Sequence, residues 1–372
     1  MRTVAIVEQG GYLRVKSNSF FLEKDGGKIK TFHPDTVSEF LIIGKVEVSS
    51  SAIELAMRKG INFVFLTLGG KFVGKIISRE RYSPFLRISQ YNSYLVKRGH
   101  FAKIFVYGKI KNQTFVIENL LREYIRGLAG SEEEKGKRDV SFEWAEGFKN
   151  TSDFLLFRLS ELENVQDIMG IEGRASSLYF SLLPRFIFCD DFKFSGRTKR
   201  PPKDRFNSIL SSAYTLLLTT VDGAVMSSGF DPSIGFLHEI SERRPSLVLD
   251  LMEEFRPLVD IFVINLVNSG TFSKDDFFNP SEREIAILEM RNLFSDFDAK
   301  SFDIEEVFYL KPSAWRSLVK RYFGFLQTKW NYKGKNFSLR DIIYQQVYLL
   351  KRSLLGLDNY SPFMPSNLPS NF

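Results

Sequence analysis

The stretch SSSAIELAMRKGINFVFL (residues 49–66) contains a short helix followed at once by a strand. Its three serines are typical of a helix N-terminal cap, and Gly60 is typical of a helix end. Between them, Ile53, Ala56 and Met57 recur at the spacing of one helix face. After Gly60 the residues become β-branched and aromatic, which favours a strand. The stretch therefore predicts a compact helix inside a region of strands.

The residues on both sides of this stretch also favour strands. Upstream, the runs TVAIV, YLRVK and SFFLEK precede a DGG hairpin turn. Downstream, GGKFVGKI (residues 69–76) nearly matches a phosphate-binding loop, but Ile76 occupies the position of the hydroxyl residue that binds magnesium. Because this segment joins two predicted strands, we interpret it as a hairpin turn.

From about Arg87 the apolar residues recur three and four apart, which is typical of helices. The charged run SEEEKGKRD (residues 131–139) and the basic, Pro-Pro-containing segment 189–205 interrupt this pattern and are predicted to be loops. The predicted fold class is α+β. A small β-rich N-terminal domain, residues 1–86, precedes a larger, mostly α-helical domain, residues 87–372, with an irregular C-terminal tail.

Composition narrows the class of protein further. The chain has 372 residues and a net charge of +7, which favours polyanionic partners such as nucleic acid or an acidic membrane surface. Its one cysteine, Cys189, can form neither an internal disulfide nor a cysteine-based zinc site. The first residues hold too short an apolar run for a signal peptide, and no unbroken apolar stretch of about eighteen residues predicts a membrane span. We therefore expect a cytoplasmic protein.

The segment GFLHEISERRPSLVLDLMEEFRP (residues 235–257) places His238 before a predicted helix that carries three acidic residues. Asp250, Glu253 and Glu254 share one helix face, and the simpler interpretation of such a face is that solvent covers it. His238 has no second histidine four residues later, which excludes the zincin motif. On its own it is more simply interpreted as a capping or core histidine.

Glu172 lies between Gly170 and Gly173 in a segment that otherwise favours a helix. Because each glycine in a helix costs about 1 kcal/mol relative to alanine, we expect a close backbone approach or tight helix packing there. Together with His238 and a carboxylate of the later helix, Glu172 supplies the donor set of a divalent cation. One imidazole and two carboxylates suit Mn²⁺, and Mg²⁺ acceptably.

The segment 189–205 carries six basic residues against three acidic ones. Such a stretch favours contact with a phosphate backbone, and three interleaved rings, Phe192, Phe194 and Phe206, can stack on bases. A solvated connecting loop is the alternative interpretation.

Four ordered motifs resemble one family. MGIEGRASSLYF (169–180), RPPKDRFNSILSSAYTLL (200–217) and GFDPSIGFLHEISERRPSLVLDLMEEFRP (229–257), together with VYGKIKNQ (106–113), are similar to the CRISPR-associated endonuclease/integrase, the first of the numbered CRISPR-associated proteins. The resemblance implies metal-dependent cutting and joining of DNA when new spacers are captured. In this reaction a 3′ hydroxyl of the incoming fragment attacks a phosphodiester at the repeat boundary.

The resemblance also implies roles for particular residues. Glu172, His238 and Glu253 match the metal ligands, with Mn²⁺ or Mg²⁺ as the metal, although some relatives have aspartate at the position of Glu253. Helix geometry alone does not choose between Glu253 and Glu254. Asp250 is a nearby acid that either binds the metal or orients the imidazole.

The expected partners follow from the same resemblance. They are double-stranded and branched DNA, a second copy in a homodimer formed through the strand-rich domain, and the second of the numbered CRISPR-associated proteins. The residues expected to contact DNA are Arg174, Arg197, Lys199, Arg200 and Lys203, with Asn207 and Tyr214 as site-lining residues that can instead pack in the core. Two other functions stay open, a non-catalytic DNA-binding assembly module and a structure-specific repair nuclease without joining activity.

Overall fold

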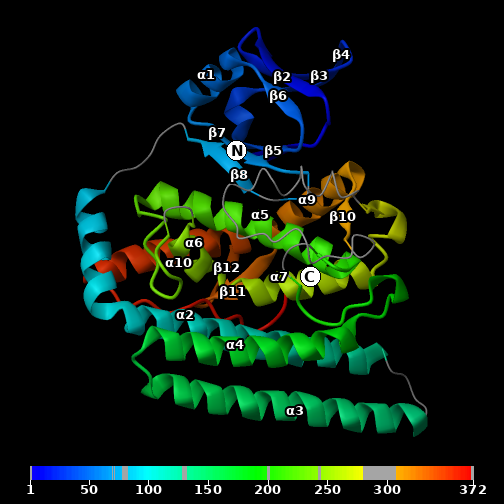
Figure 1. Cartoon of the computed structure of the whole chain (residues 1–372), viewed down its shortest axis with the longest axis vertical. Coiled ribbons are helices and arrows are strands. Elements are labelled where there is room, and N and C mark those ends of the chain that lie inside the picture. The colour runs from blue at the N-terminus through cyan, green and yellow to red at the C-terminus, as the bar shows by residue number, and fades with distance from the viewer. Residues whose placement is uncertain are drawn as a thin grey trace, which may run out of the picture. The chain divides into compact units, whose positions relative to one another are not determined.

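The computed structural model of the chain describes residues 2–68, 70, 72–77, 83–127, 132–198, 202–241, 244–279 and 307–369 (Figure 1). Strands predominate up to residue 76 and helices predominate afterwards, which confirms the predicted α+β class. The chain divides into two compact units. The first comprises residues 1–80, 198–216 and 272–322, and the second comprises residues 81–197, 217–271 and 323–372. The domain boundary predicted between residues 86 and 87 stays a prediction.

The first unit contains two four-stranded sheets. One has the order β1 (Arg2–Ile6), β5 (Val37–Ile43), β7 (Asn62–Leu66), β8 (Phe72–Ile76), and its β7–β8 pair is antiparallel while the other pairs are parallel. The other has the order β4 (Gly27–Phe32), β3 (Ser19–Lys24), β2 (Gly11–Lys16), β6 (Val46–Val48), with only the β2–β6 pair parallel. The antiparallel β7–β8 pair confirms the hairpin predicted for GGKFVGKI.

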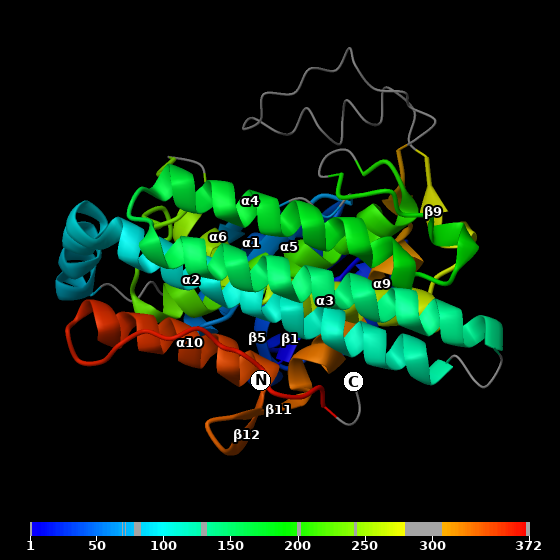
Figure 2. The ribbon, with the colours of Figure 1, turned by 90° about the horizontal axis from the view of Figure 1, so that it is seen from below.

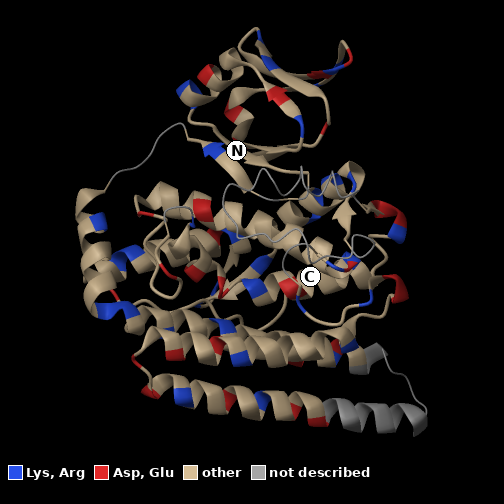
Figure 3. Ribbon diagram, in the orientation of Figure 1, with Lys and Arg blue, Asp and Glu red and all other residues tan. Residues whose placement is uncertain are grey.

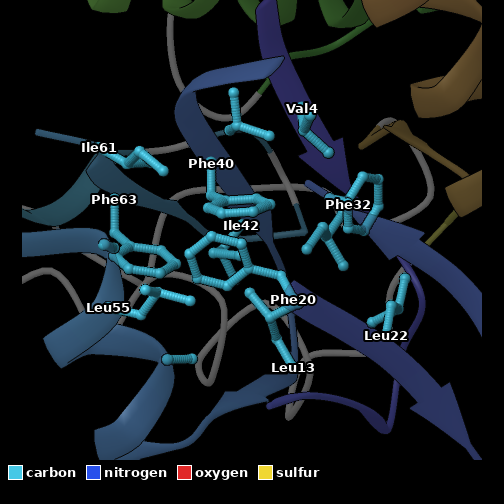
Figure 4. Packing of buried hydrophobic residues seen from close by; sticks show 14 residues of the cluster. Val4, Leu13, Phe20, Leu22, Phe32, Phe40, Ile42, Leu55, Ile61 and Phe63 are labelled. Atoms are coloured by element: carbon cyan, nitrogen blue, oxygen red, sulfur yellow. The ribbon is translucent and has the colours of Figure 1, made fainter. Parts of the chain in front are cut away.

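Four phenylalanine rings pack with aliphatic side chains in the core of this strand-rich region, as Figure 4 shows. The ring of Phe40 stacks on that of Phe63 with 5.3 Å between centroids and meets the edge of Phe20 at 4.8 Å. The helix α1 (Ser50–Lys59) contributes Leu55 to the same cluster. Its predicted ends are confirmed, because Ser49 caps the N-terminus and Gly60 ends the helix in the left-handed conformation.

Later residues complete the first unit. The strands β9 (Phe277–Phe278) and β10 (Tyr309–Leu310) pair antiparallel. The indole of Trp315, in α9 (Pro312–Gln327), donates a hydrogen bond of 2.7 Å to the carbonyl oxygen of Leu68. Gly70 leaves room for this indole, since a Cβ there would lie 2.5 Å from a ring carbon.

Three long helices lie side by side in the second unit: α2 (Pro84–Gly127), α3 (Glu132–Glu161) and α4 (Val165–Leu182) (Figures 1 and 2). The backbone of α2 bends at Lys97, where its dihedral angles are not helical. Apolar side chains of all three helices pack together with Leu237, the neighbour of His238. This packing fixes the histidine-bearing segment against the bundle.

The start of α3 corrects the prediction of a charged loop at residues 131–139. Glutamate, lysine and arginine are good helix formers, so a run of mixed charges favours a solvated helix as readily as a loop. Figure 3 shows charged residues of both signs alternating along the described part of α3. The loop prediction was therefore wrong from residue 132 onwards.

The helix predicted after Pro245 is two helices, α6 (Ser246–Met252) and α7 (Arg256–Asn268). Pro257, in the first turn of α7, lacks the N–H that would bond to the carbonyl of Glu253, and its ring would clash with that carbonyl. The helix breaks at residues 253–255, and this break turns Glu253 and Glu254 towards different partners.

The remaining elements belong to both units. Their bounds are α5 (Arg205–Ser228), β11 (Lys329–Tyr332), β12 (Lys335–Ser338) and α10 (Leu339–Leu354), with the 3-10 helices η1 (Pro34–Thr36), η2 (Leu183–Phe186), η3 (Asp190–Phe192) and η4 (Lys274–Asp276). Among the described residues, α5 alone is long and apolar enough to cross a membrane, and 67% of its apolar window is buried, as in a core helix.

Candidate active site

The imidazole of His238 is held by the carboxylate of Asp250. The His238 Nδ1 atom lies 2.7 Å from Asp250 Oδ1, which also accepts a hydrogen bond of 2.9 Å from the backbone N–H of His238. A carboxylate only accepts hydrogen bonds, so Nδ1 carries the proton and Nε2 of the neutral ring is left with a free lone pair. Asp250 therefore orients the imidazole so that Nε2 can serve as a ligand.

Asp250 is completely buried, and its second oxygen binds the backbone of the same segment. Oδ2 accepts hydrogen bonds from the N–H groups of Phe236 and Leu237. This close contact requires glycine at position 235, since a Cβ there would lie 2.7 Å from Asp250 Oδ2 and 2.8 Å from a backbone oxygen. One buried carboxylate thus fixes the loop before α6 and the ring that the loop carries.

Glu172 and Glu253 both face the ammonium group of Lys109. Lys109, in the middle of α2, donates a hydrogen bond to Glu172 Oε1, and its Nζ atom lies 2.6 Å from Glu253 Oε2. Burial alone would lower the pKa of Lys109, but Glu253 and Glu172 outweigh it and raise the pKa above its usual value. The two carboxylates are therefore brought together around one buried positive charge.

Glu253 is ionised throughout the ordinary pH range. Burial would raise the pKa of its carboxyl, but the opposing charges of Arg256 and Lys109 outweigh it and lower the pKa to about 2. The Nε atom of Arg256 lies 3.0 Å from Glu253 Oε1. Glu253 is only 4% exposed, so the interpretation of a solvated acidic face is wrong for this residue and for its equally buried neighbour Glu254.

Among the described residues, no three His, Cys, Asp or Glu side chains lie close enough together to hold a metal ion as they stand. Carboxylate oxygens and an imidazole nitrogen still suit a divalent cation as donors, and two of the three predicted ligands, Glu172 and Glu253, meet at Lys109. A cation already lies between the carboxylates, in the form of the Lys109 ammonium. Glu253 Oε2 has no partner in the described structure besides this ion pair with Lys109. The predicted ligand set stays a prediction.

Glu254 faces the other way and binds residues 360–363, which we call the C-terminal strap. Its Oε1 accepts a hydrogen bond of 3.1 Å from the Tyr360 hydroxyl, and its Oε2 accepts one of 2.9 Å from the Phe363 N–H. The Asn112 side chain donates to the backbone oxygens of both Glu254 and Phe363, at 2.6 and 2.8 Å. The strap therefore anchors the residue next to Glu253.

A pH-dependent stability is expected from Glu254. Burial raises the pKa of its carboxyl to about 8, although hydrogen bonds from Phe363 and Tyr360 oppose the rise. Because the unfolded chain releases this proton near its ordinary pKa, the stabilising effect is complete below that value and lost as the pH rises through 8. The free energy of unfolding should fall by up to ~1.4 kcal/mol per pH unit between these limits.

A Glu254→Gln variant removes this titration and should have a flatter dependence of unfolding free energy on pH between 5.5 and 8, measured by urea denaturation. Glu161→Gln, at an exposed site on α3, is the matched control and should keep the slope of the parent protein. Equal slopes in the Glu254→Gln variant and the parent would contradict the neutral state of Glu254.

The aromatic residues in and beside the basic segment 189–205 do not lie where the sequence analysis placed them. Phe192, Phe194 and Phe206 are buried in the fold, so the prediction that they stack on bases is wrong. Arg197 is partly exposed and Lys203 is exposed. Lys199 and Arg200 lie outside the described residues, and the proposed contact of the segment with DNA stays a prediction.

The predicted close backbone approach at Gly170 and Gly173 is also wrong within this chain. A Cβ at either position would meet no heavy atom within 4 Å. Both glycines are exposed on α4, as is Arg174, while Glu172 on the neighbouring side of the helix is half-buried. This face of α4 therefore stays open beside Glu172.

Asn207 and Tyr214 are buried residues of α5. The side chain of Asn207 accepts a hydrogen bond from the Thr198 N–H and donates one to Asp204, so it ties the basic segment to the start of the helix. These contacts favour the packing alternative for Asn207. The predicted site-lining role of both residues stays untested.

Several residues around the carboxylates were missed by the sequence interpretation. Ser176 donates a hydrogen bond of 2.8 Å to Glu172 Oε1, and Gln113 lies 3.5 Å from the Ser176 hydroxyl. Together with Lys109 and Asn112, Gln113 lies at the spacing of one helix face within the motif VYGKIKNQ. This stripe of polar residues among apolar ones was the signal in the sequence that could have indicated them.

Comparison with known proteins gives concordant matches. The family model described as CRISPR associated protein Cas1 matches residues 4–292. The chain is 30% identical to "CRISPR-associated endonuclease Cas1 3" of Thermus thermophilus, covering 95% of this chain and 97% of the relative. It is 29% identical to "CRISPR-associated endonuclease Cas1 1" of Chlorobaculum tepidum, covering 98% of each.

Solved structures share the fold. A Cas1 protein from Thermotoga maritima has a TM-score of 0.75 at 26% identity, covering 97% of this chain and all of that one. A casposase bound to an integration product has a TM-score of 0.79 at 20% identity, covering 99% and 94%. A Cas6-RT-Cas1–Cas2 complex has a TM-score of 0.75 at 21% identity, and the match covers 98% of this chain and 36% of that one.

Proposed function

This chain belongs to the CRISPR-associated protein Cas1 family, and we propose that it is a metal-dependent DNA endonuclease and integrase that inserts spacer DNA into a CRISPR array. The names of its curated relatives, which are endonucleases, support the nuclease part. The similar casposase bound to an integration product supports the joining part. The observation that carries the proposal is the convergence of Glu172 and Glu253 on one buried cation.

The proposed reaction is phosphoryl transfer. The 3′ hydroxyl of the incoming fragment gives its proton to water and forms a bond to a phosphorus atom of the array. The bond from that phosphorus to its 3′ oxygen breaks, and this leaving oxygen takes up a proton from water. A bound Mn²⁺ or Mg²⁺ supplies Lewis-acid stabilisation of the charge on the reacting oxygens. Glu172, Glu253 and the Nε2 atom of His238 would hold that cation, while Asp250 holds the imidazole in place from the other ring nitrogen.

Basic residues position the DNA in this proposal. Arg174 follows Glu172 on the open face of α4 and contacts a phosphate. Arg197, Lys199, Arg200 and Lys203 contact the backbone without reading bases, because phosphates carry no sequence information.

The assembly is also part of the proposal. The protein forms a homodimer, acts in the cytoplasm and assembles with Cas2. The similar fold within a Cas6-RT-Cas1–Cas2 complex supports the choice of Cas2 as the partner.

A strand-joining assay on branched DNA tests the proposal. The protein, with and without Cas2, is given a labelled fragment with a free 3′ hydroxyl, Mn²⁺ or a chelator, and the products are separated by length. Joined products that disappear with the chelator are the expected result. Cleaved products without joined ones would favour a repair nuclease instead, and DNA binding without chemistry would favour an assembly module.

A further inference from the structure

The charges around Glu172 and Glu253 balance without a metal. Two carboxylates face the ammonium of Lys109 and the guanidinium of Arg256. The Lys109 side chain is only 9% exposed, and the Glu253 side chain is 6% exposed. Buried charges are costly unless they are paired, so this arrangement stabilises the site in the absence of any ion.

A divalent cation cannot simply be added to this arrangement. Mg²⁺ takes carboxylate oxygens at about 2.0–2.1 Å, so a metal bound to both carboxylates would occupy the space that the ammonium fills. The Lys109 Nζ atom already contacts both carboxylates, at 2.6 Å from Glu253 Oε2. If the ammonium stayed, the two carboxylates would face four positive charges in a buried site, one each from Lys109 and Arg256 and two from the metal. Like charges at contact distance repel strongly.

We propose that Lys109 is an internal counter-ion that takes the place of the metal and must leave the carboxylates before a divalent cation binds. The inference rests on the proposed function, since it assumes that Glu172 and Glu253 are metal ligands. The lysine side chain has four rotatable bonds, so its ammonium can move while α2 keeps its position. Lys109 is thus a positioning residue that holds both carboxylates and lowers the affinity of the site for metal.

The partners of Glu172 and Glu253 allow the Lys109 ammonium to leave both carboxylates. Ser176 donates a hydrogen bond to the same Oε1 atom of Glu172 that Lys109 contacts, so this carboxylate keeps a partner when the ammonium leaves. Glu253 keeps Arg256, whose Nε atom lies 3.0 Å from Oε1. Departure of Lys109 therefore frees one oxygen of Glu253 and one bonding direction at Glu172 while both side chains stay anchored.

Manganese binding to a Lys109→Met variant tests the inference. The variant removes the competing charge but keeps an apolar stem of similar length. Titration with MnCl₂ alone, followed by calorimetry and by the electron paramagnetic resonance signal of free Mn²⁺, should give a Kd at least about tenfold lower than that of the parent protein. Without metal, the variant should unfold at a lower temperature, and Mn²⁺ should raise that temperature by more than it does in the parent.

Lys103→Met is the matched control, because Lys103 lies on the same helix and pairs at 2.7 Å with the exposed Glu163. It should leave the Kd for Mn²⁺ unchanged. An unchanged or higher Kd in a folded Lys109→Met variant, with Mn²⁺ still bound through Glu172 and Glu253, would overturn the role of Lys109 and leave the proposed function intact. Absence of Mn²⁺ binding from the parent and the variant alike would overturn both.

A second measurement does not depend on the folding of the variant. In crystals of the parent protein soaked with MnCl₂, anomalous scattering locates the ion. We expect the ion between Glu172 and Glu253 and the Lys109 Nζ atom beyond contact distance of at least one of them. An ion on these carboxylates with the ammonium still touching both would contradict the proposal.

Discussion

Glu172→Gln is expected to reduce the rate of Mn²⁺-supported strand joining at least about a hundredfold, because preorganised electrostatic stabilisation of a transition state is worth that much per group. The substitution keeps the shape of the side chain and its acceptor for the Ser176 hydroxyl, which lies 2.8 Å away. It removes the negative charge that holds a cation beside Glu253. The measurement is a single-turnover assay of joined product, with the thermal unfolding temperature recorded to show that the variant is folded.

Asp167→Asn is the matched control for this variant. Asp167 lies on the same helix, α4, but in its exposed first turn. Its neutralisation should change the joining rate by no more than about twofold, since an exposed charge is worth a few tenths of a kcal/mol. A folded Glu172→Gln protein that joins DNA as fast as the parent would remove Glu172 from the site.

Asp250→Ala should lower the free energy of unfolding by about 3–5 kcal/mol, the range for removing one partner from a buried charged network. The carboxylate accepts hydrogen bonds from three successive backbone N–H groups, those of residues 236–238, and from the His238 ring. Alanine leaves these donors buried without acceptors, and each unsatisfied donor costs about 1–3 kcal/mol. Urea denaturation of the parent and the variant measures the difference.

Asp153→Ala provides the comparison for this measurement. Asp153 lies 3.6 Å from Lys111, and both side chains are well exposed. Its loss should change the unfolding free energy by less than about 1 kcal/mol, as is usual for surface ion pairs. A similarly small change in Asp250→Ala would mean that water or another group replaces the carboxylate and that Asp250 does not hold the histidine loop.

Local signals were sufficient to predict much of the fold. Ser49 and Gly60 mark the ends of α1 because capping depends on residues next to the cap. The break between α6 and α7 was missed, although Pro257 gave the signal, because apolar spacing continues through it. The charged run at the start of α3 was misread because a solvated helix and a solvated loop can have the same charged composition.

The candidate site was also predictable only in part. His238 and Asp250 are close in the sequence, and their pairing was an open alternative before the structure showed the contact. Lys109 and Glu172 lie 63 residues apart in the sequence and on different helices. No local sequence pattern specifies a contact between them. The Phe192 ring shows a further limit, because alternation of aromatic and basic residues does not tell which side chains enter the core.

The attachment of residues 360–363 to Glu254 and Asn112 has a consequence for biosynthesis. A ribosome makes the chain from its amino end, so Glu172 and Glu253 emerge long before residues 360–363 do. The turn that carries Glu253 therefore acquires its full support only after those last contacts form. A nascent chain that has not reached residue 363 lacks them, and this order delays full assembly of the candidate site until that segment has been made.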